Sequence, residues 1–325
     1  SVGEQSPFDN AAQGSFSFQV ADASIKGFSE ANSSVDNLNL QKMTAQYGPT
    51  GGQLTLNSAQ AMNLQSNGVK LGSSDVSGLQ ASVQQDGHGS FDSTIMAKSL
   101  SVNEASGDSF GKAQNIDAQN LNLQAAQSNG VLSTSGSADT LNINSLDTDA
   151  VDAANISISK AAATSNEQGL SVSAHSVDAL SLDSQFVDTD ALSLKGADFA
   201  IKGNDIDFNA DKLRASEVDS DDVDVGSLSL DQAALNISDK NVSIDTDSLN
   251  ATGLNSEFVN AEDISSSNVN VSFGNTDTTV NADSLQATDL SSKFVDTSNL
   301  TTENLRFSQN QEEISTEFSA LSASN

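Results

Sequence analysis

Seven aspartates recur at fixed positions in a repeat of thirty-six residues and carry most of the chemistry that the sequence suggests. Carboxylate oxygens are the ligands that Ca²⁺ prefers in proteins. If like positions stack, these side chains would lie close enough for cations to bridge neighbouring repeats. The aspartates occupy two columns, one with Asp147, Asp183 and Asp219 and the other with Asp152, Asp188, Asp224 and Asp296.

Two interpretations of these columns remain open. Calcium is the only cofactor we predict, at irregular and weak sites, because no EF-hand loop or glycine-rich calcium repeat is present. The simpler alternative is that aspartate suits solvated corners of the fold and keeps the protein soluble. Asn255, Asn260 and Ser291 interrupt the two columns, and a third column holds Asp139, His175, Asp211, Asp247 and Asp283.

The sequence offers little else for catalysis. His88 and His175 are the only histidines, and there is no cysteine, so a thiolate zinc cluster is excluded. The glycine-rich stretch from Gly48 lacks the lysine of a phosphate-binding loop. We predict that the protein is not an enzyme.

Composition narrows the partners. The chain has 325 residues and a formal net charge of −31, which argues against binding nucleic acid. No stretch approaches the roughly 20 apolar residues of a membrane span. The first residues lack the basic and apolar regions of a signal peptide, although they would equally suit a chain from which one had been removed.

The repeat predicts the elements that position the aspartates. Successive lines of thirty-six residues keep apolar residues in the same columns, and within a line many apolar residues lie five apart, as Leu300 and Leu305 do. Between these pentads, apolar and polar residues alternate around tight turns. The clearest column, which we predict to be internal, holds Val151, Val187, Val223, Val259 and Val295.

A single repeat of this length has too few apolar residues to form its own core, so the pattern favours coils that stack and bury one another's apolar side chains. We therefore predict an all-β protein, an elongated parallel β-solenoid with a thirty-six-residue repeat. Residues 1–15 would be an N-terminal segment or cap, and residues 16–325 a single β-solenoid of about nine coils.

The pentads TDLSS and SNLTT, from Thr288 and Ser298, resemble those of pentapeptide-repeat proteins. Most of the chain is similar in style to bacterial secreted β-solenoid repeat proteins of the adhesin and biofilm-matrix type. This resemblance implies an extracellular or cell-surface structural protein: an adhesin stalk, a matrix component or a filament subunit. Its expected partners are further copies joined end to end, or a polysaccharide or protein of the cell surface or matrix.

Two other functions remain open at this stage. The acidity would suit a pentapeptide-like solenoid that mimics DNA, with its carboxylates at phosphate-like spacing on one face. The many carboxylates would also suit a β-helical enzyme that acts on polysaccharide, which should show a single cleft that breaks the repeat.

Overall fold

The computed structural model describes residues 14–30, 32–85, 90–108, 111–185, 187–238, 241–274, 276–293, 295–310 and 313–324. These residues form 18 β-strands and no helix, so the all-β prediction is confirmed. The strands are β1 (Phe16–Glu30), β2 (Ser33–Gly48), β3 (Gly51–Ser66), β4 (Val69–Gln85), β5 (Phe91–Gly107), β6 (Gly111–Ser128), β7 (Val131–Asp147), β8 (Val151–Asn166), β9 (Gly169–Ser184), β10 (Thr189–Lys202), β11 (Asp205–Val218), β12 (Val223–Ile237), β13 (Val242–Ser256), β14 (Val259–Phe273), β15 (Asp277–Ser292), β16 (Asp296–Asn310), β17 (Ile314–Glu317) and β18 (Ala320–Ser324).

The chain forms two compact units, and the first strand of the first unit begins at Phe16. One unit comprises Ser1–Thr148 and Lys160–Gln168, and the other comprises Asp149–Ser159 and Gly169–Asn325. Of the expected N-terminal segment, residues 1–13 lie outside the described part of the chain.

Within each unit the strands pair antiparallel with their neighbours in the chain, so the predicted parallel solenoid is wrong. Two strands and two hairpin turns, not one coil, account for the thirty-six residues. Residues one period apart therefore lie on next-nearest strands. The sequence period is the same for both folds, which is why the columns did not distinguish them.

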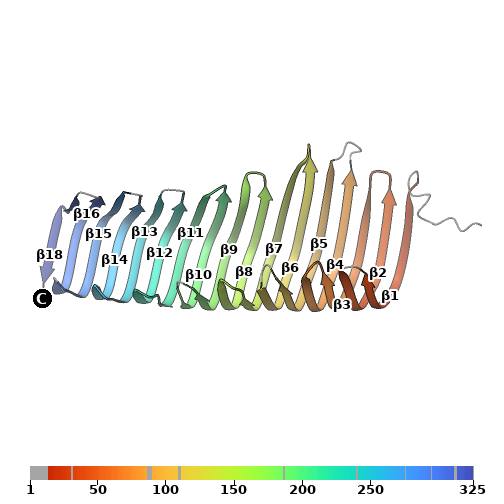
Figure 1. Ribbon diagram of the computed structural model, residues 1–325, viewed down its shortest axis with the longest axis horizontal. Coiled ribbons are helices and arrows are strands. Elements are labelled where there is room, and N and C mark those ends of the chain that lie inside the picture. The colour runs from red at the N-terminus through yellow and green to blue at the C-terminus, as the bar shows by residue number, and fades with distance from the viewer. Residues whose placement is uncertain are drawn as a thin grey trace, which may run out of the picture. The chain divides into compact units, whose positions relative to one another are not determined.

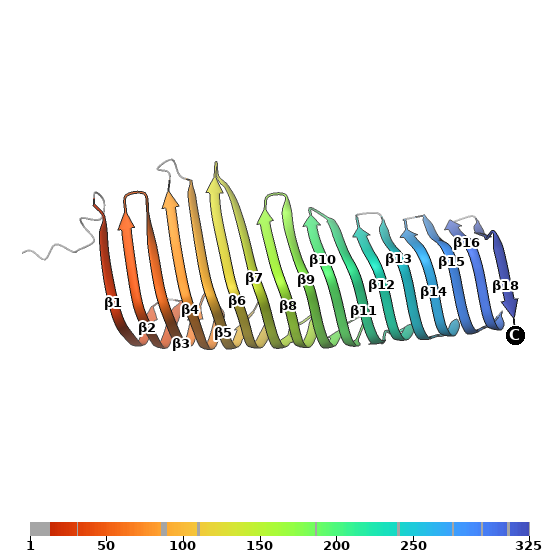
Figure 2. The same cartoon turned by 180° about the vertical axis from the view of Figure 1, so that it is seen from behind.

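Each long strand bends at two places, called here the first and second corners. Residues with positive φ mark them on alternating strands: Gln232 (φ 53°) at the first corner of β12, and Gly253 (φ 62°) at the second corner of β13. The register of the pairing is the same on both sides of each corner. In Figures 1 and 2 the strands within each unit run side by side and bend back at their lower ends.

The corners explain the five-residue spacing. On β13, Ile244, Leu249 and Leu254 face the same side of the sheet, as do their cross-strand partners on β12, Leu235, Leu230 and Val225. Side chains on one face of a regular strand recur every two residues. At each corner the step is three residues, so one step of each kind gives a period of five.

Burial on this side identifies it as the inner face of the bend. Small residues beside the corners are the most buried, such as Thr246, Ala251 and Ala261 on β13 and β14. Among the described residues no large side chain falls below 2 % exposure. Much of the apolar inner face is therefore only half covered.

The valine column is not internal, contrary to the prediction. Val187, Val223 and Val295 are 40 %, 37 % and 46 % exposed. Each closes a hairpin turn that begins with a serine three residues earlier; in the turn that ends at Val223, for instance, the Ser220 hydroxyl accepts from the valine N–H. The turn geometry, not core packing, explains why this column recurs.

Candidate functional site

The inner face divides into a closed and an open part. The short arm, beyond the second corner, bends back toward the middle of each strand. The open arm is the stretch between the first corner and the hairpin at the other end, as in Val242–Thr246 of β13 and Val269–Phe273 of β14. Beside the first corner many inner side chains are buried, whereas farther along the open arm they are half-buried or exposed.

Three strands carry strongly exposed apolar side chains on the inner face of the open arm. On β5, Ala97 beside the corner is 8 % exposed, whereas Ile95, two residues farther out, is 46 % exposed. Its cross-strand neighbour Leu123 on β6 is 48 % exposed. In the other unit Phe273, at the outer end of β14, is 46 % exposed. The open arm thus presents a row of apolar side chains that no part of the described chain covers fully.

The open arm offers few polar groups to a ligand. Its strand backbone hydrogen bonds are satisfied by neighbouring strands. From β9 to β14 the inner side chains are all apolar except Thr246, whose hydroxyl donates to the Asp231 and Ser248 carbonyls. The apolar members are Leu170, Val172, Ala174, Ala197, Phe199, Ile201, Ile206, Phe208, Ala210, Ala233, Leu235, Ile237, Val242, Ile244, Val269, Val271 and Phe273.

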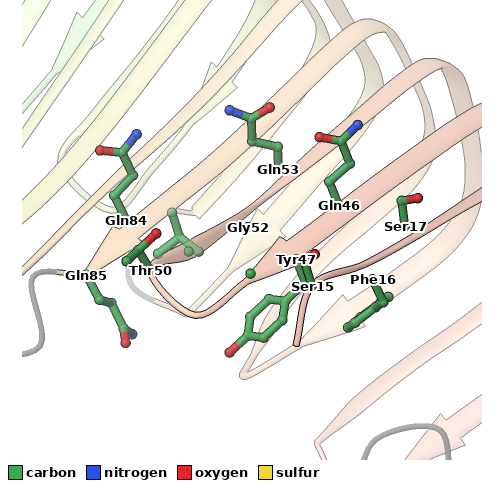
Figure 3. Close-up of a pocket in the computed structure, with 13 residues that line it drawn as sticks. Ser15, Phe16, Ser17, Gln46, Tyr47, Thr50, Gly52, Gln53, Gln84 and Gln85 are labelled. Atoms are coloured by element: carbon green, nitrogen blue, oxygen red, sulfur yellow. The ribbon is translucent and has the colours of Figure 1, made fainter. Parts of the chain in front are cut away.

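The open arm of the first unit ends in an aromatic group beside a cavity of about 670 Å³. The ring of Phe16 lies 5.6 Å from that of Tyr47 and 6.4 Å from that of Phe18, measured between centroids. In Figure 3 Tyr47 projects away from the glutamines Gln46 and Gln53, which extend from the other side of the sheet. The aromatic side chains therefore belong to the apolar face, and Gln46 and Gln53 to the polar one.

The outer face carries the predicted aspartates, and the structure brings six of the seven into one row across adjacent strands of the second unit. Asp188 pairs with Asp219 in an isolated bridge, and Asp224 lies opposite Asn255. The two sequence columns alternate along this row, which we call the acidic row. Its members in order are Asp152, Asp183, Asp188, Asp219, Asp224, Asn255, Asn260, Ser291 and Asp296.

Like charges face each other along the acidic row and perturb its titration. The charge of Asp188, with smaller contributions from burial and a hydrogen bond to Asp188, raises the pKa of Asp183. A hydrogen bond to Asp224, followed by the charge of that carboxylate, raises the pKa of Asp219. Both aspartates therefore hold a proton more readily than an isolated side chain does.

A hollow of about 600 Å³ lies beside these carboxylates. Gly226 and Gly253 face each other at the second corner on β12 and β13, so no side chain fills this space. The acidic residues that line the hollow are Asp183, Asp188, Asp190, Glu217, Asp219 and Asp224. Its chemistry would suit a cation.

Three predicted metal ligands do not line this hollow, although one of them, Asp152, lies close enough for its charge to act on Asp183. Asp147 belongs to the first unit, where it pairs with Lys112 of β6. Asp296 accepts a hydrogen bond of 2.8 Å from the Ser291 hydroxyl. Within the described ranges, no three acidic or histidine side chains come together in an arrangement that could hold a metal ion. The calcium prediction therefore rests on the acidity of the hollow alone.

No protein-family model matches this chain, and no curated protein or solved structure matches it either. The described residues contain no helix long and apolar enough to cross a membrane.

The sequence pattern did not lead to the open arm. Its alternating residues, such as those of Val242–Thr246, predict ordinary short strands, and nothing in them indicates that their apolar side stays uncovered. The third aspartate column proved to mark the first corner: Asp211 and Asp283 there accept hydrogen bonds from the positive-φ residues Gln232 and Asn268. At the first corner, Asp on one strand alternates with Gly, Asn or Gln on the next, and this alternation is the sequence feature that could have predicted the bend.

Proposed function

We propose that the protein binds the hydrocarbon chains of lipids along the inner face of the open arm. The observation that carries this proposal is the exposure of large apolar side chains on this face, such as Ile95 and Leu123, which are 46 % and 48 % exposed. Exposed contiguous apolar surface of this kind marks binding sites in soluble proteins. Covering it would gain about 25 cal/mol for each Å² removed from water.

The absence of free polar groups along the described open arm from β9 to β14 favours a hydrocarbon ligand over a peptide. A peptide laid on this face would lose water from its own N–H and C=O groups and find few partners, at a cost of about 1–3 kcal/mol for each unpaired group. A hydrocarbon chain has no such groups. The closed part of the bend supplies the floor of the site, and the hairpins of the open arm form its rim.

Site-specific photocrosslinking tests this proposal. A benzophenone amino acid at Leu123, on the inner face, should crosslink to phospholipid presented in phosphatidylcholine vesicles. The same amino acid at Gln124, the next residue and on the outer face, is the matched control. Equal crosslinking at the two positions, or none at Leu123, would contradict the proposal.

A second candidate function is divalent-cation binding at the acidic hollow, favoured by the six carboxylates around it. Asp183 and Asp219 would contribute most, because a cation would relieve the repulsion that raises their pKa values. Luminescence of Tb³⁺, a probe for calcium sites, should saturate in wild type and weaken in Asp219→Asn. An unchanged titration in that variant would exclude this hollow.

A secreted or surface-displayed structural role, expected from the sequence, stays a prediction, as do the DNA-mimic and polysaccharide-enzyme alternatives.

A further inference from the structure

Strand β1 is an open sheet edge in the described chain. It pairs with β2 along one side, and no described strand pairs with the other side. Four of its large apolar side chains are exposed: Phe16 by 38 %, Phe18 by 44 %, Ile25 by 43 % and Phe28 by 46 %. An uncovered apolar edge of this length is a template for another strand.

The corners restrict which strand would fit beside β1. At the first corner, positive-φ residues alternate with ordinary ones from strand to strand, as in Gln232, Asp247 and Asn268. The second corner alternates in the opposite phase, with Glu217 and Gly253 on β11 and β13. From β1 to β4 and from β9 to β16, each strand therefore has its positive-φ residue at one corner only, and its neighbours have theirs at the other; β6 and β8 instead have one at both corners, and β5 and β7 at neither.

Strand β1 follows the same rule and can extend it. Its positive-φ residue is Gly27 (φ 63°) at the second corner, while Ala21 occupies the first corner with ordinary geometry. The next strand in the sheet should run antiparallel and place a positive-φ residue beside Ala21. A second copy of β1, turned by a two-fold rotation so that the partner's Gly27 lies beside Ala21, meets both conditions.

We propose that two copies of this chain pair through β1 in this antiparallel register to form a symmetric dimer. Ser24 lies at the centre, opposite its own counterpart. On the inner face Val20 meets the partner's Phe28, and Ala23 meets the partner's Ile25. Each of these contacts occurs twice because the interface is isologous.

The charges on the outer face of β1 fit the same register. Asp22, Ser24 and Lys26 face outward, opposite Gln41, Asn39 and Asn37 of β2. In the dimer Asp22 would lie opposite the partner's Lys26, and Lys26 opposite the partner's Asp22. In a chain with 13 basic and 44 acidic residues, this match singles out the register. Opposite charges directly across an antiparallel pair stabilise it.

The dimer would extend the inner face across the interface, because Val20 and Phe28 belong to that face on β1. It also differs from head-to-tail stacking in a measurable way. A two-fold interface covers the same edge of both copies, so assembly ends at the dimer. A head-to-tail contact leaves one edge free on each copy and allows filaments to grow. The proposal does not depend on lipid binding.

Sedimentation equilibrium of the full chain, with charge variants of β1, tests the dimer. Lys26→Glu replaces two attractive contacts by two repulsive ones, so the dimer dissociation constant should rise about tenfold or more. The double variant Asp22→Lys with Lys26→Asp restores opposite charges and should return the constant to near the wild-type value. Lys195→Glu, on the exposed side of β10, is the control and should have no effect.

A cysteine at the centre of the interface tests the register independently. The chain contains no cysteine, so Ser24→Cys introduces a single thiol that faces its own counterpart. Mild oxidation should give covalent dimers from Ser24→Cys, and far fewer from Ser29→Cys near the end of the same strand. Monomers at every concentration without a disulfide at position 24, or oligomers beyond dimers that ignore the charge variants, would overturn the proposal.

Discussion

The two faces of the same strands differ in what would stabilise them: the inner face is apolar and incompletely covered, and the outer face carries carboxylates that repel one another. On β13, Ile244 and Leu249 face inward among apolar neighbours, while Asp245 and Asp247 face outward into solvent. The inner face gains if something apolar covers it, and the outer face gains if protons or cations relieve its charge. A strand ladder that satisfies its own backbone leaves both faces free to bind, and their side chains decide what each binds.

The largest difference between the faces should appear beside a first corner. Leu56 on β3 is 5 % exposed, and Thr55 beside it faces outward and is exposed. Leu56→Asp would bury an unpaired charge and should cost several kcal/mol of unfolding free energy. Thr55→Asp should change it by about 0.5 kcal/mol or less. Urea unfolding measures both, and equal losses would mean that the faces are assigned wrongly.

A smaller loss is expected where the strand bends. Asn268 has φ 49° and donates a hydrogen bond of 2.6 Å to Asp283. Asn268→Val would force a β-branched residue into this conformation and should cost about 1–3 kcal/mol. Asn250→Val, on the outer face of β13 away from a corner, is the control. If the two variants unfold at the same urea concentration, the bend does not depend on the residue at position 268.

The outer face should respond to pH in the direction that the raised pKa values of Asp183 and Asp219 require. A carboxyl whose pKa is higher in the folded state contributes stability at low pH, below its unfolded pKa, and that contribution is lost as pH rises through the folded pKa. At neutral pH, Asp219→Asn should therefore raise the melting temperature. The gain should disappear near pH 4, and a variant less stable than wild type at pH 7 would contradict the account.

Calcium sharpens the same comparison. At neutral pH, millimolar Ca²⁺ should raise the melting temperature of wild type more than NaCl of equal ionic strength does. The excess should shrink in Asp219→Asn, which removes one carboxylate from the hollow. If the two salts raised the melting temperature equally, general screening of the charges would explain the effect without a specific calcium site.

The smallest effect should come from the valine that the sequence placed in the core. Val223 closes a hairpin turn and is 37 % exposed, and its turn contacts use backbone atoms. Val223→Asp should therefore shift the urea midpoint only slightly. If Val223→Asp lost as much stability as Leu56→Asp, the valine column would have to be internal after all.

The sequence predicted the all-β class, the repeat length and the grouping of the aspartates, because periodicity reports which residues recur together. It did not predict strand direction, since a coil and a pair of antiparallel strands give the same period. Leu249 and Leu254 are five apart in either fold. The bend itself depends on positive φ at residues such as Glu217, whose side chain does not favour that conformation. The open arm depends on how far the short arm reaches, which no local pattern records.

The central claim is that the inner face of the open arm is accessible and takes up lipid, and thiol labelling tests it most directly. Ile95→Cys faces inward at a position that is 46 % exposed, and Met96→Cys faces outward at one that is 42 % exposed. Without lipid both should react with maleimide at similar rates. With phosphatidylcholine vesicles, labelling at position 95 should slow severalfold while position 96 stays unchanged. Equal protection at the two positions, or none at position 95, would contradict the account.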